Sequence, residues 1–303
     1  MNHQRSCTLV VDGGVDLPPA LIAQYGLHIV PLTVHFGDES YQSGVTITPA
    51  AFYQRLRERG EFPTTSQPAV GDYVGAYVRA AEAGLPILSL HLSSGLSGSY
   101  NAASAARALV PELDITLVDT RTLTGEMALQ VLVAAEMAEQ GRPIAEICEV
   151  LRTVNERSHL YFTIDKLDYL RRGGRLGRVA GAVGNLLGIR PIVTVDKSTG
   201  TYVAAGKARS FRRAVETVAE RIIEDVGEGG EVSLMILEGY CPDQVAHLVS
   251  LLRSRLDVIW FHHVHANPSL GAHVGPDAIG AAYFPGPLPF VGGDVAEADL
   301  ETA

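Results

Sequence analysis

The chain has 303 residues, of which 47% are hydrophobic and 19% are charged. This composition is typical of a globular protein with a large core, and the length is sufficient for two domains. No apolar run approaches the ~18 residues that a membrane-spanning helix requires, and from the residues before Cys7 we expect no signal peptide. With three widely spaced cysteines, the sequence predicts a reduced, cytoplasmic protein without an integral membrane segment.

The net charge of −10 conceals a basic segment. Between Lys166 and Arg213 the chain has eleven lysines and arginines and two acidic residues, so this segment carries +9 and the rest of the chain −19. One basic face on an acidic protein favours a local anionic partner and argues against general affinity for nucleic acid. The charge is explained equally well by a solvent-exposed face whose positive charges are balanced by acidic residues elsewhere in the fold.

In the first half of the chain, strand-like and helix-like segments alternate. This alternation predicts a mainly parallel sheet with helices on its faces, and in such sheets ligands bind at the carboxyl ends of the strands. The predicted strands are 7–12, 29–36, 86–92 and 114–119, and the predicted helices are 18–25, 49–60, 71–83, 99–109, 125–140 and 144–156.

After Ser158 the pattern changes to a strand-rich one with fewer helices. We therefore expect an α/β protein of two domains, an N-terminal α/β domain over 1–157 and a second, mixed α/β domain over 158–284. The Pro-rich and acidic residues 285–303 are predicted to form a disordered tail. The predicted strands are 159–164, 189–195, 202–205, 232–237, 258–264 and 278–284, and the predicted helices are 212–225 and 243–256.

The most informative run is the apolar strand at 87–92, which is followed by a Ser/Gly turn and a helix that starts near Ser99. Backbone N–H groups and hydroxyls around Ser93, Ser94 and Gly95 would converge there, and a helix N-terminus favours a small anion. A carboxylate and a phosphate both suit such a turn. The turn has no lysine and lacks the Gly-x-Ser-x-Gly pattern of serine hydrolases, so binding is favoured over catalysis.

Other polar motifs have two interpretations each. Pro-Thr-Thr-Ser-Gln-Pro at 63–68 is either a loop with a helix cap or the lining of a polar pocket. His273, in a glycine-flanked segment predicted to be a loop, is either exposed or a donor to a carboxylate. His-His-Val-His at 262–265 has no cysteine or acid at ligand spacing, so we expect no metal.

The glycine-rich segment 173–188 is neither a Walker loop nor a good dinucleotide fingerprint. Its Gly181 and Gly184 more simply allow a helix to approach another backbone or a ligand closely. We therefore expect no nucleotide cofactor.

Several motifs occur along the chain in an order that can be compared as a whole. They are Thr-Ser-Gln-Pro at 65–68, Leu-Ser-Ser-Gly-Leu-Ser-Gly at 92–98, Asp-Thr at 119–120, Leu-Arg-Arg-Gly-Gly-Arg-Leu at 170–176, Lys-Ala-Arg at 207–209 and Ala-His-Val-Gly at 272–275. Taken together and in this order, they closely resemble the DegV family of bacterial fatty-acid-binding proteins. The resemblance implies a two-domain α/β fold that buries one long-chain fatty acid. It also implies that Thr65, Ser93 or Ser94 with Gly95, and His273 hold the carboxylate.

The resemblance further implies a partner. In the best understood members of the family, the protein serves as the lipid-carrying subunit of a fatty acid kinase, and a separate ATP-dependent kinase subunit phosphorylates the bound carboxylate. Arg175 and Arg209 would then face the partner or the phosphate, and the chain alone would have no catalytic residue. Transient contact with a membrane would load the lipid. Gly13 and Gly14 depart from the family pattern, which has hydroxyl side chains there.

Two other functions remain open at this stage. One is a lipid sensor or transporter without a kinase partner. The other is a substrate-binding enzyme subunit similar to that of dihydroxyacetone kinase, with His273 as the attacking group on a small ketone.

Overall fold

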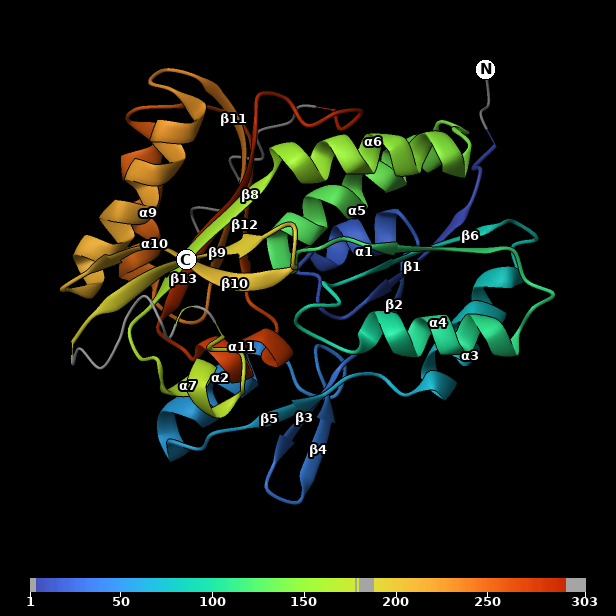
Figure 1. Cartoon of the computed structure of the whole chain (residues 1–303), viewed down its shortest axis with the longest axis horizontal. Coiled ribbons are helices and arrows are strands. Elements are labelled where there is room, and N and C mark those ends of the chain that lie inside the picture. The colour runs from blue at the N-terminus through green and yellow to red at the C-terminus, as the bar shows by residue number, and fades with distance from the viewer. Residues whose placement is uncertain (1–3, 178, 180–187, 293–303) are drawn as a thin grey trace.

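The computed structural model describes residues 4–177, 179 and 188–292 (Figure 1). Within these residues the strands form three sheets. The predicted α/β class is confirmed, with one parallel sheet and a second, mixed sheet. Gly181 and Gly184 lie outside the described residues. None of the described helices is both long enough and apolar enough to cross a membrane.

The first sheet is parallel throughout and has the strand order β2-β1-β6-β7. Its helices cover both faces, as the alternation predicts: α3 and α4 pack on one face through Tyr77, Ala103 and their neighbours, and α1, α5 and α6 pack on the other. The elements are β1 Thr8–Asp12, α1 Pro19–Gln24, β2 His28–Val30, α3 Val70–Ala81, β6 Ile87–His91, α4 Ser99–Leu109, β7 Ile115–Asp119, α5 Thr124–Glu139 and α6 Ile144–Arg157.

The second sheet has the order β10-β9-β8-β13-β11-β12, and its strands are antiparallel except for the β11–β12 pair. Helices α9 and α10 cover one face, and α5 contacts the other. The elements are β8 His159–Ile164, β9 Arg190–Asp196, β10 Thr201–Ala208, α9 Phe211–Val226, β11 Glu231–Glu238, α10 Pro242–Arg253, β12 Asp257–His265 and β13 Ala278–Pro285.

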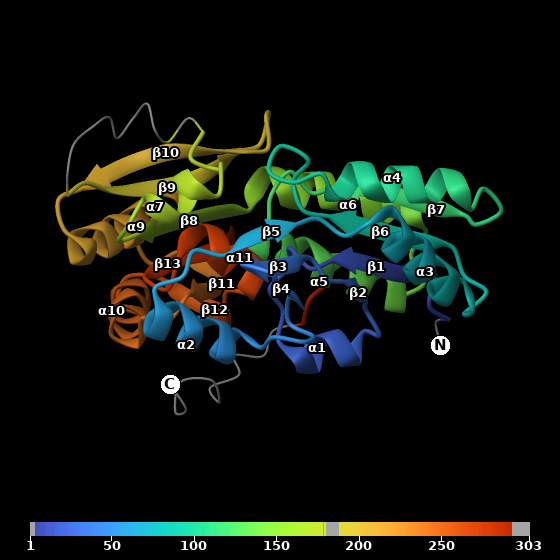
Figure 2. The ribbon, with the colours of Figure 1, turned by 90° about the horizontal axis from the view of Figure 1, so that it is seen from below.

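The third sheet is small, has the order β4-β3-β5, and joins the two halves of the chain. Figure 2 shows α2, which comes from the first half, among elements of the second half. Phe52 and Tyr53 of α2 pack with Tyr169 of α7 and Ala272 of α11 in one apolar cluster. The elements are β3 Thr33–Phe36, β4 Glu39–Gln42, α2 Pro49–Arg59, β5 Thr64–Ser66, α7 Asp168–Arg172 and α11 Pro268–Val274.

The strand predicted at 29–36 is instead two strands, β2 and β3, which belong to different sheets. Pro31 lies between them and has no N–H to donate to a sheet. The chain therefore leaves the parallel sheet at this residue and enters the small third sheet, which carries Thr65.

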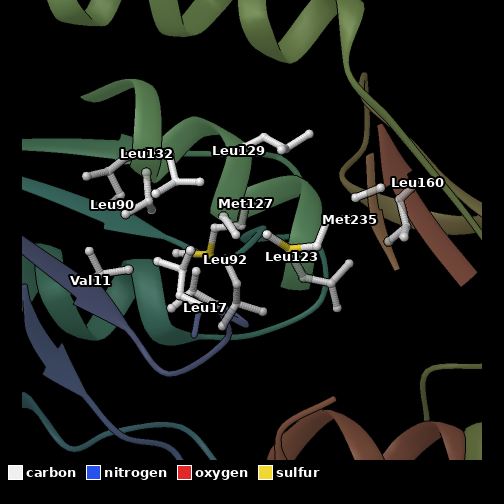
Figure 3. Close-up of a cluster of buried hydrophobic side chains, with 14 of the residues drawn as sticks. Val11, Leu17, Leu90, Leu92, Leu123, Met127, Leu129, Leu132, Leu160 and Met235 are labelled. Atoms are coloured by element: carbon white, nitrogen blue, oxygen red, sulfur yellow. The ribbon is translucent and has the colours of Figure 1, made fainter. Parts of the chain in front are cut away.

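Helix α5 is the centre of the molecule. All but two of its sixteen residues are buried, so it has no solvent-facing stripe and must be covered on every side. Figure 3 shows Met127, Leu129 and Leu132 of this helix between Leu90 of the first sheet and Leu160 of the second. The two halves of the chain thus share one hydrophobic core.

The segment predicted as a tail begins with residues that pack against this core. Leu288 is buried, and its N–H donates a hydrogen bond of 3.1 Å to Ser233 Oγ. Residues 293–303, the remainder of the predicted tail, lie outside the described residues.

Candidate functional site

A polar chamber of about 350 Å³ lies beyond the carboxyl ends of β1 and β6, where the parallel sheet predicts a ligand site. The third sheet and α11 form its opposite side. It is lined by Gly14, Leu32, Thr65, Ser66, Gln67, Leu92, Leu96, Ser97, Leu123, Arg175, Tyr202, Ser269, Leu270 and His273.

Thr65 and His273, predicted as site residues from distant motifs, meet in this chamber. The Thr65 Oγ1 and His273 Nε2 atoms are 2.8 Å apart. Thr65 is held on β5 by pairing with Val34 of β3. His273 lies in the last turn of α11, so the expected loop is wrong: Asn267 caps this helix by accepting from the Leu270 N–H, and Pro268 occupies the first turn.

The His273 imidazole is neutral at physiological pH. Burial, and to a lesser degree the positive charge of Arg175, lowers its pKa to about 4. In the tautomer that is protonated on Nε2, the imidazole donates to Thr65 Oγ1 and leaves the threonine hydroxyl free to donate to a ligand. Gly173 lies against the other ring nitrogen, since a Cβ there would be 2.2 Å from His273 Nδ1. The pair is therefore uncharged and closely packed, and in this tautomer Thr65 is its donor toward a ligand.

Ser93 and Ser94 use their hydroxyls inside the protein. Ser93 is fully buried and donates to the Gly200 carbonyl at 2.7 Å, and Ser94 donates to Asp119 Oδ2 at 2.6 Å. The β9–β10 hairpin covers this turn so closely that a Cβ on Gly95 would lie 2.4 Å from Thr199 O. The structure does not bring these three residues to the chamber lining, which the turn reaches instead through Leu96 and Ser97.

The two arginines occupy different places. Arg175 lines the chamber, half-buried, and donates through Nη1 to the Gly173 carbonyl at 2.6 Å. An anion bound in the chamber would therefore lie near the positive charge of Arg175. Arg209 follows β10 and is exposed outside the chamber lining.

An apolar crevice lies next to the chamber, in the space between α5, α11 and the second sheet. Leu123, Tyr202 and Leu270 line both spaces and form the boundary between them, called the junction below. The crevice measures about 30 Å³, and its lining is almost wholly aliphatic or aromatic. The lining residues beyond the junction are Thr124, Leu160, Phe162, Leu237, Glu238, Ala266, Val274, Ala278, Ile279 and Gly280.

The wall near Gly13 and Gly14 is apolar. The buried Asp12 carboxylate accepts the Gly14 N–H at 2.9 Å and the Leu92 N–H at 3.0 Å, which holds this loop against the end of β6. A Cβ on Gly14 would lie 2.5 Å from Leu92 Cδ2. The absence of a side chain at Gly14 thus allows Leu92 to form part of the chamber wall.

Asp16 fixes the start of α11 relative to α5. Its buried carboxylate accepts hydrogen bonds from the Asn267 N–H at 2.9 Å, from Asn267 Nδ2 at 2.8 Å and from the Thr124 hydroxyl. Burial raises its pKa to about 6. The helix that carries His273 is thereby tied to both halves of the chain.

Two of the three histidines of β12 lie near a carboxylate that comes from the neighbouring strand. His265 Nδ1 lies 3.0 Å and His263 Nε2 lies 3.6 Å from Glu238 Oε1. Across the described ranges, the structure places no three histidine, cysteine or acidic side chains so that they could hold a metal ion.

Sequence reasoning missed five polar chamber residues: Ser66, Gln67, Ser97, Tyr202 and Ser269. Ser66, Gln67 and Ser97 lie within the two motifs that were singled out, so the motifs contained the signal although the individual side chains were not chosen. Tyr202 and Ser269 had no signal, because each reaches the chamber through tertiary packing alone.

Comparisons with known proteins agree with this architecture. Residues 6–286 match a family model described as "Uncharacterised protein, DegV family". A DegV domain-containing protein of Deinococcus radiodurans is 39% identical over 96% of this chain and 99% of its own length.

Solved structures show the same fold. A DegV family protein from Thermus thermophilus, described as fatty acid binding, superposes with a TM-score of 0.84 at 31% identity over 92% of this chain and 99% of its own. A stearic acid-binding protein from Eubacterium ventriosum gives a TM-score of 0.83 at 27% identity over 92% of this chain and 98% of its own.

Proposed function

This chain belongs to the DegV family, and we propose that it binds one long-chain fatty acid, with the carboxylate in the chamber and the acyl chain in the apolar crevice. The observation that carries the proposal is that the two spaces adjoin: the chamber, lined by the neutral Thr65–His273 pair, shares three lining residues with an apolar crevice. Relatives of the same fold are described as fatty acid binding.

The chamber volume is within the roughly 300–1,000 Å³ range of ligand sites. The crevice, at about 30 Å³, is smaller than an acyl chain, so in the proposed complex the Leu160 and Leu237 side chains that line it move aside to admit the chain. Burying a sixteen-carbon chain at ~0.8 kcal/mol per methylene gives about 12 kcal/mol before ordering and association costs. The chain would dominate affinity, and the polar pair would fix the position of the head.

The first test is the identity of the co-purified ligand. We expect denaturing mass spectrometry of the purified protein to detect about one fatty acid per chain, because the buried acyl chain dissociates slowly. Delipidated protein should then take up palmitate with the same stoichiometry. Absence of lipid, together with failure to bind added palmitate, would contradict the proposal.

We further propose that the bound carboxylate is presented to a separate ATP-dependent kinase subunit for acyl phosphate formation. The neutral Thr65–His273 pair supports this, because it positions a carboxylate without neutralising its charge in an ion pair. Arg175 borders the chamber, and Arg209 is exposed within the basic segment, where it is free to meet an anionic partner.

Arg209→Ala is expected to retain palmitate affinity within about twofold and to reduce acyl phosphate formation by at least about tenfold, because it removes a charge that steers a nucleotide-bearing partner. The measurement is palmitate-dependent ATP consumption in the presence of an added ATP-dependent fatty acid kinase subunit. Arg255→Ala, an exposed arginine paired with Glu228, is the matched control and should change neither quantity.

Equal rates of acyl phosphate formation for the two arginine variants would show that Arg209 does not belong to the partner surface. An absence of palmitate-dependent ATP consumption with wild-type protein would instead favour a sensor or transporter that has no kinase partner.

A further inference from the structure

Tyr202 occupies the boundary between the chamber and the crevice, and its side chain lines both. It comes from β10 and is 3% exposed. Its ring meets that of Phe162 edge-on, with centroids 5.3 Å apart. Phe162 belongs to the crevice, so the apolar part of Tyr202 continues the crevice wall into the chamber.

The Tyr202 hydroxyl makes no hydrogen bond with any residue that the structure describes. Burial raises the pKa of this hydroxyl, and the charge of Arg175 opposes that effect, which places the hydroxyl within electrostatic reach of the arginine at the chamber. If a ligand covers a buried hydroxyl and does not accept a hydrogen bond from it, the unsatisfied hydroxyl lowers the binding affinity. The ligand atom next to Tyr202 is therefore expected to be an oxygen and not a methylene group.

We propose that Tyr202 is a specificity-determining residue whose hydroxyl donates to the bound carboxylate while its ring packs along the first methylene groups of the acyl chain. This inference rests on the proposed fatty acid binding. A carboxylate can accept several hydrogen bonds, so the Thr65 hydroxyl and the Tyr202 hydroxyl can serve one head group together. Tyr202 would then set how far the acyl chain enters the crevice.

The test compares palmitate with 1-hexadecanol, which has the same chain length and no carboxylate. Tyr202→Phe should raise the Kd of palmitate about tenfold and that of hexadecanol at most about threefold, because a hydrogen bond to a charged oxygen is the stronger of the two. Displacement of a fluorescent fatty acid from delipidated protein measures both constants.

Tyr161→Phe is the matched control. It removes a hydroxyl that donates to Asp225 and lies outside both spaces, so both ligands should bind as to wild type. Thermal unfolding checks that each variant folds.

The outcomes separate the inference from its premise. If wild-type protein binds palmitate and Tyr202→Phe weakens both ligands equally or neither, the role of Tyr202 is refuted while fatty acid binding stands. If wild-type protein binds no palmitate at all, the proposed function itself fails.

Discussion

Lys197→Met is expected to lower the free energy of unfolding by about 3 kcal/mol, since removing one partner of a buried ion pair leaves the other charge uncompensated. Lys197 contacts the fully buried Glu126 carboxylate and lies 3.0 Å from Asn155 Oδ1. Without the ammonium group, the donors that remain to Glu126 among the described residues are the neutral Thr122 and Ser158 hydroxyls. Urea denaturation followed by circular dichroism measures the change.

Two further variants identify the cause of this loss. Glu126→Gln combined with Lys197→Met should recover most of the stability, because no buried charge remains. Arg255→Met breaks the exposed pair with Glu228 and should cost less than about 1 kcal/mol. A loss of less than 1 kcal/mol for Lys197→Met itself would show that water reaches Glu126.

Gly173→Ala is expected to weaken palmitate binding about 100-fold while leaving the protein folded. The added methyl group would lie 2.2 Å from His273 Nδ1, so the imidazole must turn away from Thr65. Both the histidine donor and the orientation of the Thr65 hydroxyl would be lost, and hydrogen bonds to a charged group contribute about 1.5–3 kcal/mol each. The Kd from fluorescent displacement is the measurement.

Gly71→Ala provides the control for this substitution. Gly71 lies in α3, and a Cβ there would meet no atom within 4 Å, so affinity should remain that of wild type. His273→Ala should match Gly173→Ala if the imidazole is the affected group. Unchanged affinity in Gly173→Ala would show that His273 does not position the carboxylate.

Local sequence patterns predicted the first half of the fold well. Apolar strands alternate there with helices, and the turn after β6 leads into α4 at Ser99 as expected. The errors also have local causes. Pro31 divides the strand that was predicted at 29–36. The Asn-Pro pair at 267–268 is a helix-start signal, and it outweighs the flanking glycines that suggested a loop around His273.

The arrangement of the candidate site depended on contacts between distant parts of the chain. Thr65 and His273 are 208 residues apart, and no periodicity shows that they meet. The Ser/Gly turn around Ser93 was predicted to face a ligand, because no residue near it in the sequence indicates that the β9–β10 hairpin covers it. Hydroxyls that satisfy a carbonyl and an aspartate inside the fold look identical, in sequence, to hydroxyls that face a ligand.

The position of β13 has a consequence for biosynthesis. This strand follows all the others in the chain, yet it lies between β8 and β11 in the second sheet. Until β13 has left the ribosome, strands β8 and β11 each have an edge without a hydrogen-bonding partner. Such unpaired edges promote incorrect association between chains. A chain truncated before Ala278 would keep both edges open, so quality control in the cell should recognise such fragments as unfolded.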